Sequence, residues 1–97
     1  MYLAQIIEML NGIVRLARTG CSAEAASLVN RSVAKIQQAL QSSPPAPGVL
    51  RELVYSLETL LLMQQQQDWV GLADVVEYEL VEQVTSWSRG VAQDRPS

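Results

Sequence analysis

Three carboxylates lie close together in the stretch QQQQDWVGLADVVEYEL, at Asp74, Glu77 and Glu79. Carboxylates this close can work as an acid and a base, bind a metal ion, pair with a partner's cation, or face water. A di-metal helical bundle combines its carboxylates with histidines, and the chain contains no histidine. A paired-carboxylate hydrolase holds its two acids across a cleft, whereas Asp74 and Glu77 belong to one predicted helix. We therefore predict no catalytic residue, no metal site and no cofactor.

Helical geometry separates these acids from one another. At about 100° per residue, Asp74, Glu79 and Glu82 fall on the side away from the apolar stripe of their helix, and we expect Asp74 and Glu79 to face water. Glu77 lies at the edge of the stripe, beside Leu80, with no cation one turn away. An ionised carboxylate is expensive to bury unless it is paired. We therefore predict that Glu77 lies at a protein–protein contact, where it meets an arginine or stays at a hydrated rim.

Arg18 is the cation that an up-down arrangement brings nearest to this region. In such a bundle the end of the first predicted helix lies beside the start of the last one, so Arg18 could meet Asp68 or Asp74. A pair of this kind is normally worth less than about 1 kcal/mol when it is exposed.

Two tryptophans lie on one stripe of the last predicted helix. Trp69 and Trp87 are about five helical turns apart. They can form part of the core, or they can anchor a partner helix in an apolar groove. The candidate partner-binding residues are Trp69, Glu77, Tyr78, Val81 and Trp87.

Apolar residues recur every three or four positions in four segments, which predicts four amphipathic helices. Gly20 ends the first, and Ser22 is expected to cap the second by accepting a backbone N–H bond. The proline-rich stretch Ser42 to Gly48 forms the next connection, with a turn at Pro44 to Gly48. A turn at Gln67 to Asp68 precedes the fourth, and Asp68 is its expected N-cap. The alternative is one continuous helix from Val49 to Trp87.

The predicted fold class is all-α, an antiparallel helical bundle of four helices that self-association could extend. Short connections favour antiparallel neighbours. Residues 1–92 form the single predicted domain and residues 93–97 a flexible tail. The middle of each stripe is expected to form the core: Leu10, Ile13, Val33, Ile36, Leu57, Leu60, Val76 and Leu80.

Composition excludes several classes of protein. The formal net charge of −3 argues against nucleic-acid binding, which needs a basic surface. The longest run of large apolar residues, Leu60 to Met63, is too short to span a membrane. The start of the chain lacks a basic region and contains Glu8, unlike a secretory signal. The lone cysteine, Cys21, cannot form an internal disulfide and is consistent with a cytoplasmic location.

The segment QQDWVGLADVVEYELVEQVTSW resembles small helical proteins of bacterial flagellar loci, and its turn with an Asp-Trp pair is similar to flagellar export chaperones of the FliT type. The residues that carry the resemblance are Asp68, Trp69, Leu72, Ala73, Asp74, Glu77, Tyr78, Glu79 and Leu80. The resemblance covers about the last third of the chain and brings no catalytic motif. It implies a non-enzymatic chaperone or adaptor that binds an export substrate or another cytoplasmic protein. The alternative is a structural subunit whose apolar faces are used for homo-oligomerisation.

Overall fold

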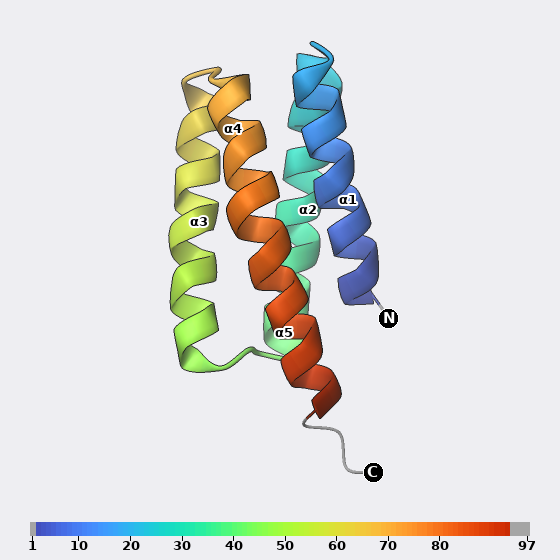
Figure 1. Ribbon diagram of the computed structural model, residues 1–97, viewed down its shortest axis with the longest axis vertical. Helices are drawn as coiled ribbons and strands as arrows, with labels where there is room; N and C mark the ends of the chain where they lie inside the picture. The colour runs from blue at the N-terminus through green and yellow to red at the C-terminus, as the bar shows by residue number, and fades with distance from the viewer. Residues whose placement is uncertain (1, 94–97) are drawn as a thin grey trace.

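The computed structural model describes residues 2–93, and in this range it contains helices and no strand (Figure 1). This confirms the predicted all-α fold. The last three elements follow one another without a break, and we call them together the last helix. The elements are α1 (Tyr2–Arg18), α2 (Ser22–Ser42), α3 (Pro47–Gln65), α4 (Trp69–Val75), the π-helical turn η1 (Val76–Leu80) and α5 (Val81–Gln93). The predicted tail lies outside the described residues, apart from residue 93, which ends α5.

The last helix occupies the middle of the fold. Figure 1 shows that consecutive helices run in opposite directions, so α1 and the last helix are antiparallel. The last helix packs against α1 along one side and against α3 along the other, while α2 packs mainly against α1. Close backbone approaches between α2 and α3 are sparse. The bundle is therefore closed on three sides and loosely packed where α2 faces α3.

The first predicted turn is confirmed, although its capping residue is wrong. Gly20 has a φ of 82°, a left-handed conformation that costs glycine little. The N–H of Cys21 then turns back to the carbonyl of Leu16 at 2.9 Å, which satisfies one of the free carbonyls at the end of α1. Cys21 occupies the N-cap position of α2 without a side-chain cap. Ser22, predicted to be the cap, already lies inside the helix.

The turn between α3 and α4 repeats the same backbone motif with a residue other than glycine. Gln67 has a φ of 58°, and the N–H of Asp68 bonds the carbonyl of Met63 at 2.9 Å. The side chain of Asp68 accepts a bond from the N–H of Gly71 at 2.9 Å and so caps α4. The predicted turn is confirmed, and the alternative of one continuous helix is wrong.

The connection between α2 and α3 is shorter than the predicted linker. Only residues 43–46 lie outside the two helices. Pro47 begins α3, where its missing N–H is harmless because the first N–H groups of a helix have no intrahelical partner. Pro47 and Gly48 therefore belong to the helix and not to the turn.

The core confirms most of the residues predicted from the stripes. Six of them are fully buried: Leu10, Ile13, Ile36, Leu60, Val76 and Leu80. Val33 and Leu57 were also expected in the core, but they are only half-buried. The fully buried positions beside them are Ser32 and Ser56, whose small side chains let neighbouring helices approach closely. The prediction placed Val33 and Leu57 in the core, whereas the structure buries the smaller serine that precedes each of them.

A π-helical turn keeps the last helix in contact with the core. The N–H of Val81 bonds the carbonyl of Val76, five residues back instead of four. Leu72 and Val75 are buried before this turn, and Val84 is buried after it. In a straight α-helix at about 100° per residue, Val84 would point about 120° away from Leu72 and about 180° away from Val75. The additional residue in the π-turn restores their alignment.

We predict that Gln67→Gly stabilises the protein by about 1 kcal/mol. A left-handed backbone costs a residue other than glycine about 1–2 kcal/mol, and part of this gain is lost to the greater flexibility of unfolded glycine. Urea denaturation measures the difference. Gln66→Gly is the matched control, because Gln66 has right-handed backbone angles, and it should destabilise. A loss of stability in Gln67→Gly would contradict this account of the turn.

The two leucines of α3 should differ in the effect of truncation. Leu60→Ala removes a fully buried side chain and should cost about 2–5 kcal/mol in the free energy of unfolding. Leu57→Ala should cost less than Leu60→Ala, because Leu57 keeps part of its surface in water. Denaturation of dilute protein provides the comparison. Equal losses would show that Leu57 is buried as completely as Leu60.

Candidate functional site

The five candidate partner-binding residues do not form one continuous surface. Trp87 is 1% exposed, and its indole N–H donates to the carbonyl of Ser43 at 2.7 Å, which ties the end of α2 to the last helix. Trp69 and Val81 are half-buried and pack against the core. Tyr78 is 67% exposed. Trp87 therefore belongs to the core and offers no surface to a partner in this conformation.

Glu77 finds its arginine within the same chain. The Arg18 guanidinium donates two hydrogen bonds to the Glu77 carboxylate, at 3.1 and 2.9 Å, and a third to Asp74 Oδ1 at 3.3 Å. The predicted contact between Arg18 and Asp74 is thus present, whereas Asp68 serves as a helix cap. Glu77 was expected to meet an arginine of a partner because no cation lies one turn away on its own helix, whereas its arginine lies at the end of α1. Glu77 consequently needs no partner to balance its charge.

We call Arg18, Asp74 and Glu77 the Arg18 cluster, and within it Arg18 and Glu77 each favour the charged form of the other. The Arg18 guanidinium holds the pKa of the Glu77 carboxyl below its ordinary value of 4.5, while partial desolvation acts in the opposite direction. Glu77 in turn raises the pKa of Arg18. All three side chains remain substantially exposed, so water and salt screen their attraction. The cluster orients α1 against the last helix more than it stabilises the fold.

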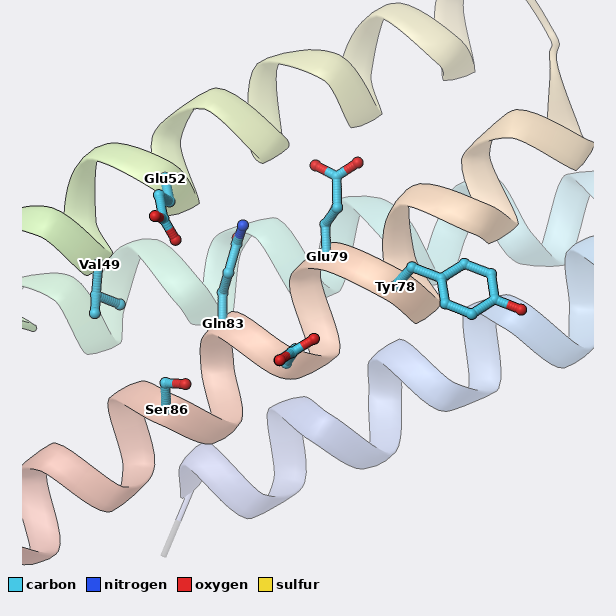
Figure 2. A pocket seen from close by; sticks show the side chains of 7 residues that line it. Val49, Glu52, Tyr78, Glu79, Gln83 and Ser86 are labelled. Atoms are coloured by element: carbon cyan, nitrogen blue, oxygen red, sulfur yellow. The ribbon is translucent and has the colours of Figure 1, made fainter.

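Glu79 faces α3 and is not mainly solvated, which corrects the prediction. Its carboxylate accepts a bond from the buried hydroxyl of Ser56 at 3.0 Å, and the amide of Gln83 donates to the same hydroxyl at 2.9 Å. Figure 2 shows Glu79 and Gln83 reaching from the last helix toward α3. The error has a simple cause. Glu79 lies about 100° around the last helix from the direction of the core. Such a position faces a neighbouring helix, and not water, when the helix has neighbours on both sides, as the last helix does.

A shallow acidic groove lies beside this hydrogen-bonded group. It encloses about 300 Å³ and is lined by Val49, Glu52, Tyr78, Glu79, Glu82, Gln83 and Ser86 (Figure 2). Across residues 2–93, no group of three or more histidine, cysteine or acidic side chains is placed to hold a metal ion.

A second surface lies on the flank of α3 that faces away from the last helix. Ser56 defines the side of α3 that contacts the last helix through its bonds to Glu79 and Gln83. Four apolar residues lie about 100–160° around α3 from Ser56, and we call them the seam stripe. Leu50 and Leu57 are half-buried, and Val54 and Leu61 are more than 40% exposed.

The flank of α2 on the same side of the bundle carries no charge. A methyl group added at Gly12 would come within 3.0 Å of Leu28, so the flank of α2 that carries Leu28 faces α1. Val33 and Leu40 lie about 120–140° around the helix from Leu28 and are half-buried. The charged residues of α2 lie within about 60° of Leu28 instead. They are Glu24, Arg31 and Lys35. The region between α2 and α3 is thus apolar or neutral.

Sequence reasoning missed this surface because it assigned six apolar residues of α3 to one stripe: Leu50, Leu53, Val54, Leu57, Leu60 and Leu61. The helix carries two: one set around Leu53 and Leu60, which is buried, and the seam stripe on its flank. The spacing of the apolar residues did indicate a second surface, because a helix whose apolar residues span so wide an arc must pack against more than one neighbouring helix.

Comparison with known proteins adds a family but no function. A family model described as a domain of unknown function, DUF8042, matches residues 1–90. No curated protein matches the chain, and no solved structure matches it. Within the described residues, no helix is long and apolar enough to cross a membrane.

The Arg18 cluster predicts a pH-dependent effect of Glu77→Gln. The lowered pKa of Glu77 means that its pairing stabilises the fold above about pH 4.5 and that this contribution is lost as pH falls through the folded-state pKa. The wild type should therefore be more stable than the variant at pH 7, and the difference should shrink in acid and in high salt. Urea denaturation at several pH values measures it. Glu82→Gln is the control, because Glu82 is exposed and makes no ion pair within the described chain.

Proposed function

From the premise that the chain belongs to the DUF8042 family, we propose that it is a non-enzymatic helical protein–protein interaction module. We place its docking surface between α2 and α3. One observation carries the proposal: the seam stripe presents large apolar side chains at helical spacing on a flank of α3 where, within residues 2–93, the backbones of α2 and α3 approach each other at few points. Apolar groups exposed in a continuous row of this kind mark sites where proteins associate.

The geometry suits a helical partner. The seam stripe follows the pattern of positions i, i+4, i+7 and i+11, by which one helix packs against another. The uncharged flank of α2 lies alongside, so an incoming apolar helix would desolvate no charge there. Val54 and Leu61, each more than 40% exposed, would lose the most contact with water on docking. Burial of apolar surface is the main driving force for such association.

A chaperone or adaptor is the more specific form that the resemblance to flagellar export chaperones supports. Such a protein would act in the cytoplasm and bind its client through a helical surface. The Asp-Trp pair that carries the resemblance serves a structural purpose here, since Asp68 caps α4 and Trp69 packs against the core. The second candidate is a structural subunit that uses the same apolar surface for self-association.

Neighbouring leucines on α3 provide a matched test of the docking surface. Leu61 belongs to the seam stripe and is 44% exposed, while Leu62 is 48% exposed and points away from the seam. We expect Leu61→Asp to weaken association at least about tenfold, because it places a charge in an apolar contact. Leu62→Asp should leave association unchanged. Light scattering measures self-association, and calorimetry with a purified partner captured from a lysate measures hetero-association.

Both variants must first show the helical circular dichroism and the cooperative unfolding of the wild type. If they do, and if Leu61→Asp associates as well as Leu62→Asp in both measurements, the surface between α2 and α3 is not a docking site and the proposal is wrong.

A further inference from the structure

We infer that the occupant of the surface between α2 and α3 is a second copy of this chain, with the two α3 helices packed antiparallel across a two-fold axis. The inference rests on the proposed function, because it names the partner for the same docking surface. It goes further by fixing the residues that meet and the direction of the partner helix.

The seam stripe reads the same from either end. Its members are separated by four, three and four residues along α3. When a second α3 runs antiparallel, Leu50 can lie opposite Leu61 of the second copy and Val54 opposite Leu57 of the second copy. The two-fold axis repeats both contacts, so each apolar side chain meets another apolar side chain. A self-complementary surface of this kind is what a two-fold dimer requires.

The charges at the edge of the seam stripe fit the same register. Arg51 and Glu58 each follow a member of the stripe and lie seven residues apart, on the outer edge of α3. Antiparallel packing brings such equivalent edge positions together, so Arg51 lies opposite Glu58 of the second copy, twice in the dimer. Within residues 2–93 neither side chain forms an ion pair. Both are exposed and available to a partner.

A parallel pair of α3 helices would lose this match. In a parallel pair, the residues on one edge of the seam stripe lie beside the residues on the other edge of the partner's seam stripe. The opposite edge of the seam stripe consists of Leu53 and Leu60, which are fully buried in the core of their own chain. Arg51 and Glu58 would then have no opposite charge to meet. The charge pattern thus selects the antiparallel arrangement.

Charge exchange tests the pairing directly in the full chain. Light scattering after size-exclusion chromatography should give the wild type a mass of twice the 10.7 kDa of one chain. Arg51→Glu and Glu58→Arg should each weaken the dimer at least about tenfold, because each places like charges together at both contacts. A mixture of these two single variants should form a heterodimer, since both of its contacts then join opposite charges. The double variant with Arg51→Glu and Glu58→Arg should recover the dimer.

The outcomes separate this inference from the proposed function. A wild type that stays monomeric at every concentration overturns the dimer, while the docking surface stands if Leu61→Asp still weakens binding of another protein. A dimer that neither Leu61→Asp nor charge exchange weakens lies elsewhere on the molecule and overturns the inference. A dimer that Leu61→Asp weakens but that charge exchange leaves unchanged overturns the antiparallel register. Circular dichroism of each variant confirms that the fold is intact.

Discussion

Four buried residues of the last helix, Leu72, Val76, Leu80 and Val84, recur every four residues, and a straight α-helix cannot keep that spacing on one face. Each step of four overshoots a full turn by about 40°, so the stripe would rotate away from the core. The π-turn takes up this rotation. Because α1 and α3 both pack on the last helix, the π-turn keeps the buried face that they share aligned along its length.

The two sides of the last helix hold their neighbours by different chemistry. Toward α1 it presents an exposed ion pair between Glu77 and Arg18, which solvent weakens. Toward α3 it presents a hydrogen-bonded group around the buried Ser56 hydroxyl. The second kind of contact is directional, and it acts together with the burial of Leu53 and Leu60 to set which flank of α3 faces inward. The seam stripe lies on the flank that this orientation leaves outside.

Local patterns in the sequence predicted the elements well, and long-range contacts were harder. The apolar periodicity identified the helices, and Asp68 was recognisable as a cap because its partner lies only three residues away. The ion pair between Arg18 and Glu77 joins residues far apart in the chain, so the spacing of residues along one helix does not predict it. Burial of Ser32 and Ser56 also escaped prediction, since a hydroxyl is usually buried only with a hydrogen-bond partner, and the partners of Ser56 lie on another helix. Within the described residues Ser32 Oγ has no such partner. The π-turn was not predicted, although the four-residue spacing of Leu72, Val76, Leu80 and Val84 is the pattern that it accommodates.

The narrow attachment of α3 has a consequence for motion. This helix contributes only Leu53, Ser56 and Leu60 to the fully buried interior, fewer than α1 or α2. Fewer buried side chains anchor α3 than anchor α1, so the amide protons of α3 should exchange with solvent sooner than those of α1. An outward movement of α3 would expose the buried row of Leu53 and Leu60 beside the seam stripe, while the contacts of α1 with α2 and with the last helix would remain. The apolar area open to a partner would then be larger than the area that the described conformation exposes.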